Sequence, residues 1–145
     1  MRLLIQRVRS ANVKIAGQTV GEIGQGLMTL VGFTHSDTME TVKYLAEKCV
    51  NYRIFEDDQG KMNRSLLDIS GSMLIVSQFT LYGDTSKGRR PGFDAAAKPD
   101  VAIPLYEAFV DEVRRYGVTV GTGEFGADML VALENDGPVT FMLEK

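Results

Sequence analysis

The stretch of sequence that decides the fold is Met73-Leu74-Ile75-Val76-Ser77-Gln78-Phe79-Thr80-Leu81-Tyr82-Gly83-Asp84. Its first four residues are apolar and partly β-branched, which predicts a fully buried strand. Polar side chains follow at Ser77, Gln78 and Thr80, where the strand leaves the core, and such a position is a common place for a binding site. A basic loop comes next, Lys87-Gly88-Arg89-Arg90-Pro91-Gly92-Phe93. We therefore expect the strand, the polar turn and the loop to form the functional part of the chain.

The composition is that of a soluble protein with one domain. The 145 residues suffice for a real core, and 44% of them are hydrophobic and 24% charged. The N-terminus becomes charged too soon for a signal peptide and no apolar run reaches membrane-spanning length, so we expect a cytoplasmic protein without membrane contact. Cys49 is the only cysteine, which excludes an internal disulfide. The net charge of −3 argues against indiscriminate nucleic-acid binding but permits a local basic site.

The first third of the chain is typical of an antiparallel meander. The expected strands cover residues 3–8, 12–15, 19–23 and 27–33. Residues 53–55 suggest a further short strand. The acidic segment 56–61 after it lacks the spacing of a calcium loop, so we interpret it as a solvated turn.

Two helices are predicted from apolar residues spaced three and four apart. Asp37 is expected to cap the first helix, with Glu40 completing a capping box. The expected buried face of this helix contains Val42, Leu45, Ala46, Cys49 and Val50. Cys49 is therefore interpreted as an inert buried thiol. The second helix starts at Pro99 and ends before Gly117. Its expected buried face contains Leu105, Ala108, Phe109, Val113 and Tyr116.

The C-terminal third predicts a closing set of strands. They begin at residues 118–120 and continue at 129–133 and 139–143, with a turn at Asn135-Asp136-Gly137-Pro138. No repeat, low-complexity tract or linker interrupts the chain. The sequence thus predicts an α+β fold: a mostly antiparallel, barrel-like sheet with two main helices, in a single domain over residues 1–145.

A dinucleotide-binding motif and a histidine-activated nucleophile are both suggested by local sequence, but the surrounding residues argue against each. Gly121-Thr122-Gly123-Glu124-Phe125-Gly126 spells the dinucleotide fingerprint, but too few residues follow for the helix and strand that this motif needs, so a bend or bulge is expected. His35 is the only histidine and could in principle activate Ser77 or Thr80, but a solvated polar residue is the plainer expectation before a helix cap. There is no histidine–cysteine cluster for zinc. We expect neither a metal nor a cofactor.

Two further segments carry both a functional and a plain interpretation. Lys87, Arg89 and Arg90 could contact phosphates, or they could simply form a solvated basic loop. Asn135-Asp136-Gly137-Pro138 could be an ordinary hairpin turn. Alternatively, Gly137-Pro138, where the cis peptide costs only about 0.5–1 kcal/mol more than trans, could present bare carbonyls as a rigid steric wall.

The motifs resemble those of the D-aminoacyl-tRNA deacylase (D-tyrosyl-tRNA deacylase) family of the bacterial and eukaryotic type. The resemblance rests on Ser77-Gln78-Phe79-Thr80-Leu81, on Lys87-Gly88-Arg89-Arg90-Pro91 and on Asn135-Asp136-Gly137-Pro138-Val139-Thr140. It runs from Gln6-Arg7-Val8 to the C-terminus. Gly83 and Gly92 stand where slightly larger residues are expected, outside these signatures.

The resemblance implies a homodimer that hydrolyses the ester between a D-amino acid and the 3′-terminal adenosine of tRNA. It also implies removal of glycine mischarged on alanine tRNA. The implied catalytic residues are Ser77, Gln78 and Thr80, and the implied substrate-binding residues are Arg7, Phe79, Leu81, Phe125 and Met129. Gly137 and Pro138 would form a cis unit that enters the site of the opposite subunit and rejects L-aminoacyl-tRNA. Arg7 would orient the Gly-Pro carbonyls, and Lys87, Arg89 and Arg90 would contact tRNA phosphates.

The chemistry of the substrate agrees with the lack of a triad. An aminoacyl ester is already activated and a neighbouring ribose hydroxyl can assist its hydrolysis, so the protein needs only to position the ester and stabilise an oxyanion. Two alternatives remain: a Ser/Thr esterase with Thr80 or Ser77 as its nucleophile, and a non-enzymatic RNA-binding module.

Overall fold

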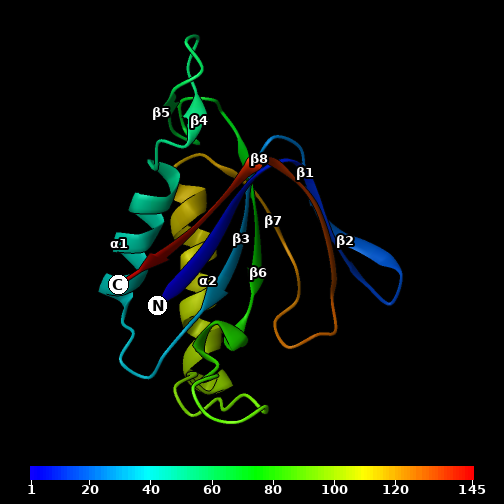
Figure 1. The fold of residues 1–145 in the computed structure, drawn as a ribbon, viewed down its shortest axis with the longest axis vertical. Coiled ribbons are helices and arrows are strands. Elements are labelled where there is room, and N and C mark those ends of the chain that lie inside the picture. The colour runs from blue at the N-terminus through cyan, green and yellow to red at the C-terminus, as the bar shows by residue number, and fades with distance from the viewer.

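A curved six-stranded sheet carries two helices on one face in the computed structural model, which describes residues 1–145 (Figure 1). The strands of this sheet are β1 (Arg2–Ile15), β2 (Gln18–Ile23), β3 (Gly26–Gly32), β6 (Ser72–Ser77), β7 (Thr119–Thr122) and β8 (Leu130–Glu144). A separate hairpin consists of β4 (Phe55–Glu56) and β5 (Met62–Arg64). The helices are α1 (Met39–Val50), the 3-10 helix η1 (Phe79–Tyr82) and α2 (Pro99–Arg115). Neither α-helix is long and apolar enough to cross a membrane.

The sheet is mixed and nearly closes into a barrel. Its order is β2-β1-β3-β6-β7, with β8 paired to β1. β1 pairs antiparallel with β2, β3 and β8, whereas β6 pairs parallel with β3 and β7. β2 and β7 approach so closely that a Cβ atom on Gly21 would lie 2.5 Å from the carbonyl oxygen of Thr122. The predicted α+β fold with a mostly antiparallel, barrel-like sheet and two helices is confirmed, and parallel pairs are added at its centre.

Strand β6 is buried on both faces, as predicted. Met73, Leu74 and Ile75 are fully buried and Val76 is 2% exposed. Met73 and Ile75 belong to the core beneath the two helices, while Leu74 and Val76 belong to a second core on the other face of the sheet. Because apolar packing holds this strand from both sides, the point at which the chain leaves the sheet is well defined.

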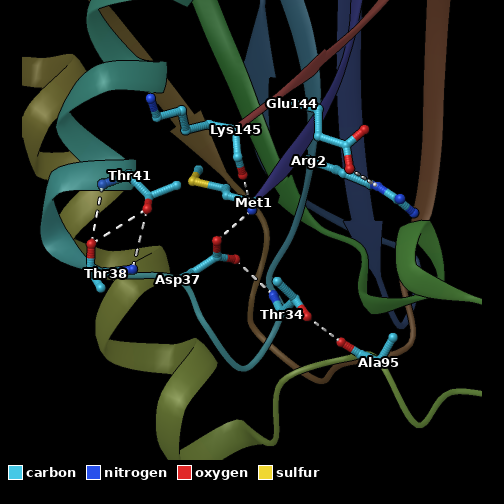
Figure 2. A network of polar contacts seen from close by, with 9 residues as sticks. All are labelled: Met1, Arg2, Thr34, Asp37, Thr38, Thr41, Ala95, Glu144 and Lys145. Atoms are coloured by element: carbon cyan, nitrogen blue, oxygen red, sulfur yellow. Dashed lines mark hydrogen bonds and ion pairs between the residues drawn. The ribbon is translucent and has the colours of Figure 1, made fainter.

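Helix α1 has a different N-cap from the predicted one. Thr38 is the N-cap, and Thr41 rather than Glu40 completes the capping box. The carboxylate of Asp37 instead binds the amino group of Met1 and accepts a 2.7 Å hydrogen bond from the backbone N–H of Thr34 (Figure 2). The prediction of Asp37 as the cap is wrong because a partner distant in sequence occupies its carboxylate. The predicted buried face of this helix is confirmed at all five positions.

Helix α2 starts at Pro99 as predicted, but its buried face is rotated. The buried residues are Ala102, Leu105, Tyr106, Phe109, Val110 and Val113. Ala108 is only partly buried and Tyr116 is 37% exposed, so both differ from the prediction. The helix ends at Arg115, which leaves Tyr116 at the C-cap, outside the last packed turn.

The segment Asn135–Pro138 is not the predicted turn between two strands. It lies inside β8, which runs without interruption from Leu130 to Glu144 and bends where its colour passes from orange to red in Figure 1. The pairing of β8 with β1 shifts register beside this segment, between Gln6 and Val8. The Gly137-Pro138 peptide is cis, and Gly137 has a φ of 132°. The sequence Asn-Asp-Gly-Pro, which favours a turn, is instead extended because β1, a single strand of 14 residues, pairs with β8 on both sides of this segment.

Cys49 is expected to be unreactive in the folded protein. Burial raises the pKa of its thiol to about 12, so the nucleophilic thiolate is scarce at neutral pH. We expect a disulfide reagent at about pH 8 to modify Cys49 at least about 100-fold more slowly in native buffer than in denaturant. A Cys49→Ser variant provides the blank. Equal native and denatured rates would contradict this account.

Candidate active site

A cavity of about 300 Å³ lies at the carboxyl end of β6. Ser77, Gln78 and Phe79 line it from the end of this strand, and Phe125 and Met129 line it from the connection between β7 and β8. Most of the remaining lining is apolar and includes Val31, Phe33 and Ala102. Sequence analysis did not select these three, although their apolar character is the usual signal for a cavity wall. A mostly apolar hollow with a few polar groups suits a small organic group whose orientation must be controlled.

Residues of β1 and β3 fix the turn that follows β6. The pairing of β6 with β3 ends at Ser77, and the Gln78 N–H then donates a 2.7 Å hydrogen bond to the carbonyl oxygen of Val31 before η1 begins. At the far end of η1, the Arg2 guanidinium donates a 2.8 Å hydrogen bond to the carbonyl oxygen of Leu81 and lies 4.5 Å from the centre of the Tyr82 ring. The polar turn is therefore tied down at both ends.

Arg2→Ala is expected to loosen η1. The substitution removes a charge-assisted hydrogen bond to Leu81, so amide hydrogen exchange at Leu81 and Gly83 should accelerate about 10-fold. Glu144→Gln is the matched control, because it weakens only the exposed ion pair between Glu144 and Arg2 (Figure 2). Unchanged exchange in Arg2→Ala would mean that the guanidinium does not hold the helix.

The hydroxyls near the cavity make no hydrogen bond to a general base, and the one carboxylate that lines the cavity, Asp128, forms none with Ser77 or Thr80. The side-chain amide of Gln78 donates a 2.5 Å hydrogen bond to the Thr80 hydroxyl oxygen. Neither Ser77 nor Thr80 donates a side-chain hydrogen bond to a carboxylate or an imidazole. Thr80 is exposed, and neither it nor the half-buried Leu81 lines the cavity itself. A hydroxyl without a base is a weak nucleophile.

His35 is engaged elsewhere. Its Nε2 atom lies 2.8 Å from the carbonyl oxygen of Asp94, and His35 does not line the cavity. Because a carbonyl oxygen can only accept a hydrogen bond, Nε2 is the donor in this contact and is not directed at Ser77 or Thr80. The arrangement gives no support to an esterase in which His35 activates Ser77 or Thr80.

Tyr106 supports the cavity, although sequence analysis did not select it. Its hydroxyl donates a 2.9 Å hydrogen bond to the carbonyl oxygen of Ile75, and its ring meets that of Phe125 edge-on at 5.9 Å. Burial raises the pKa of Tyr106 to about 12, so the hydroxyl remains a donor. Helix α2 thereby fixes both β6 and Phe125. The sequence signal that could have identified Tyr106 as buried is the three- and four-residue spacing of Ala102, Tyr106, Phe109 and Val113.

The basic loop presents free cations beside η1. Lys87, Arg89 and Arg90 are exposed, and none of them takes part in an ion pair. Two backbone hydrogen bonds of 2.8 and 2.9 Å between Asp84 and Gly92 close the base of this loop. The three cations therefore remain available to an anionic ligand.

Arg7 is buried beside the Gly137-Pro138 segment. Its guanidinium donates hydrogen bonds to the carbonyl oxygens of Asp136 at 2.9 Å and Ile54 at 2.8 Å, and its side chain is 6% exposed. The contact was expected at the Gly-Pro carbonyls. The structure has it one residue earlier, at the Asp136 carbonyl, beside the register shift between Gln6 and Val8. Gly137 and Pro138 themselves are exposed.

Within one chain, Gly137-Pro138 lies far from the cavity. It is next to the Gln6–Val8 part of β1, in the row of paired residues that includes Met73 of β6. Ser77 lies four residues further along β6, and three strand spacings separate β8 from β6. These spacings correspond to a path of roughly 20 Å along the sheet between the two segments. The structure thus brings together Ser77, Gln78, Phe79, Phe125 and Met129, and leaves Gly137-Pro138 and Arg7 apart from them.

The fold and the cavity define a class: small α+β proteins whose candidate site lies at the carboxyl end of a central strand, beside a cationic loop. The chain belongs to the family described as D-Tyr-tRNA(Tyr) deacylase, whose model matches residues 4–144. A D-aminoacyl-tRNA deacylase of Bacillus licheniformis is 63% identical over 144 residues, which cover 99% of this chain and 98% of that protein. One of Thermosipho africanus is 58% identical over 144 residues, covering 99% and 97%. The resemblance predicted from the motifs is confirmed.

Solved structures share the whole fold. A protein described as c-Myc DNA Unwinding Element Binding Protein has a TM-score of 0.93 and 37% identity, covering 100% of this chain and 99% of that one. A probable eukaryotic D-amino acid tRNA deacylase has a TM-score of 0.86 at 23% identity, covering 98% and 97%, and shows the fold alone.

Proposed function

We propose that this protein is an aminoacyl-tRNA proofreading hydrolase that cleaves the ester of D-aminoacyl-tRNA. The family and the names of its relatives support this function. The observation that carries it is the cavity at the end of β6, which joins Ser77 and Gln78 to Phe125 and Met129 and in which the Ser77 hydroxyl makes no hydrogen bond to a base. Residues 1–145 act as one deacylase domain in the cytoplasm, where charged tRNA is used.

The terminal ribose of the substrate supplies the catalytic group. Its 2′-hydroxyl lies next to the ester and assists hydrolysis, so that no protein nucleophile is needed. Ser77, Gln78 and Thr80 position the ester, and the bond between Gln78 and Thr80 restricts both side chains. The first N–H groups of η1 have no partner within the helix and can stabilise the oxyanion.

The remaining predicted residues hold the tRNA end. Phe125 and Met129 pack along the terminal adenosine, and the contact of Phe125 with Tyr106 supports a fixed ring for that purpose. Phe79 and Leu81 complete the binding surface around the ester. Lys87, Arg89 and Arg90 contact phosphates, since they are exposed and without ion-pair partners.

Chiral selection comes from a second subunit. Gly137-Pro138 is exposed and lies roughly 20 Å along the sheet from the Ser77 of its own chain, so it can serve as a wall only in the site of a partner within a homodimer. An apolar pocket discriminates by only about 1–3 kcal/mol per group, whereas a rigid backbone wall excludes an L side chain sterically. Glycine lacks that side chain and passes, which makes glycine mischarged on alanine tRNA a second substrate.

Deacylation of D-tyrosyl-, L-tyrosyl- and glycyl-tRNA, each measured against its spontaneous hydrolysis, tests this function. We expect the D and glycyl esters to be hydrolysed and the L ester to persist, because only the L side chain meets the backbone wall. Equal hydrolysis of D and L esters would indicate an unselective esterase. Tight tRNA binding with all three esters intact would favour an RNA-binding module instead.

A further inference from the structure

Two exposed phenylalanine rings stand between the cavity and the basic loop. Phe79 is 55% exposed and Phe93 is 38% exposed, and their ring centres lie 5.0 Å apart at an interplanar angle of 65°. Phe79 also lines the cavity, whereas Phe93 directly follows the loop that carries the three free cations. Neighbouring exposed aromatic rings are unfavourable in water and are typical of an interaction surface.

The backbone on both sides of Phe93 is firmly held. Before it, Asp84 and Gly92 exchange two hydrogen bonds. After it, the Asp94 carbonyl oxygen accepts a hydrogen bond from His35 at 2.8 Å. The Ala95 carbonyl oxygen accepts one from the Thr34 hydroxyl at 2.6 Å (Figure 2). The only histidine of the chain thus helps to hold the segment that carries this ring. A ring fixed in advance loses little conformational entropy when it binds a ligand.

The absence of a side chain at position 83 leaves room for the ring. A Cβ atom on Gly83 would lie 3.2 Å from a ring carbon of Phe93, closer than ordinary contact. Glycine at this position therefore allows Phe93 to pack over the end of η1 and against Phe79. The aromatic pair thus extends from the cavity, which Phe79 lines, to the end of the loop that carries the cations.

We propose that the Phe79–Phe93 pair stacks against a base of the single-stranded 3′ end of tRNA, in the nucleotides that precede the terminal adenosine. This inference rests on the proposed function. Aromatic rings combined with nearby cations are the usual means by which proteins hold single-stranded nucleic acid. Stacking tolerates any base, which suits a site that selects the chirality of the amino acid rather than a tRNA sequence.

The test compares two esters in the same variant. D-tyrosyl-adenosine lacks the preceding nucleotides, whereas D-tyrosyl-tRNA contains them. We expect Phe93→Leu to lower the ratio of kcat/KM for the tRNA to kcat/KM for the nucleoside ester by about 5- to 150-fold, mainly through KM, and Phe93→Tyr to restore it. Tyr116→Leu is the control, since Tyr116 is similarly exposed, at 37%, but lies at the end of α2 and outside the cavity.

A binding measurement separates this proposal from the proposed function. Uncharged tRNA with 2-aminopurine next to the terminal adenosine should lose fluorescence on binding the wild-type protein and much less on binding Phe93→Leu. An equal loss of activity on both esters, or equal quenching in both proteins, would overturn the stacking role. Dissociation of a dimer by Phe93→Leu would assign the pair to a subunit contact and would also overturn it. Failure of the wild-type protein to hydrolyse either D ester would reject only the proposed function, because quenching requires no catalysis.

Discussion

Removal of the 2′-hydroxyl from the terminal adenosine of D-tyrosyl-tRNA is expected to lower turnover by about 10²- to 10⁴-fold, the usual contribution of a positioned acid–base group. Thr80→Ala, in contrast, should retain much of the activity. The Thr80 hydroxyl accepts a hydrogen bond from the Gln78 amide and has no base beside it, so its removal costs positioning but no nucleophile. Single-turnover hydrolysis with the D ester attached at the 3′ position measures both effects.

Two controls make this prediction decisive. Thr80→Ser keeps the hydroxyl and should resemble the wild type. His35→Ala should retain turnover of D-tyrosyl-adenosine, because the only side-chain hydrogen bond of His35 is to the Asp94 carbonyl and His35 lies outside the cavity. If Thr80→Ala abolished turnover while the deoxy substrate was still cleaved, Thr80 would be the nucleophile. The ribose-assisted mechanism would then be wrong.

Mixed dimers are expected to recover activity that neither parent variant has. Gly137→Val forces a side chain into a residue with a φ of 132°, where its Cβ would lie 2.6 Å from Val139 Cγ2 and 3.1 Å from Arg7 Nη2. Gln78→Leu removes a polar group from the cavity. A misplacement of about 1 Å can cost about 100-fold, so each variant alone should be nearly inactive on D-tyrosyl-tRNA.

If each site combines Gln78 of one subunit with Gly137 of the other, the recovered activity can be calculated. Each hybrid dimer would contain one site with both changes and one site with neither. Half of randomly mixed dimers are hybrids, so the mixture should show about one quarter of the wild-type activity. Two affinity tags allow the hybrid to be purified and its mass and thermal unfolding to be compared with those of the parents. A purified hybrid as inactive as its parents would assign Gly137 and Gln78 to the same subunit's site.

Local sequence determined the elements whose burial follows a simple period. The apolar run of β6 predicted a strand buried on both faces, and the spacing of the α1 face predicted its buried residues without error. These predictions succeed because each side chain points where the backbone period directs it. The motif around Ser77, Gln78 and Phe79 likewise lies at the end of a strand, beside a cavity. The placement of Phe125 and Met129 beside it came from family resemblance and not from periodicity.

Only the tertiary structure decided how distant segments meet. In the folded protein the Asp37 carboxylate binds the amino group of Met1, and the Tyr106 hydroxyl donates a hydrogen bond to Ile75. Residues Asn135–Pro138 lie within one long strand that pairs with β1. The tertiary structure also directed His35 to the Asp94 carbonyl, so that no side-chain hydrogen bond joins His35 to Ser77 or Thr80. Each of these outcomes depends on a partner far away in sequence, and local signals cannot rank such contacts because their free energy comes from burial and hydrogen bonds that exist only after the chain has folded.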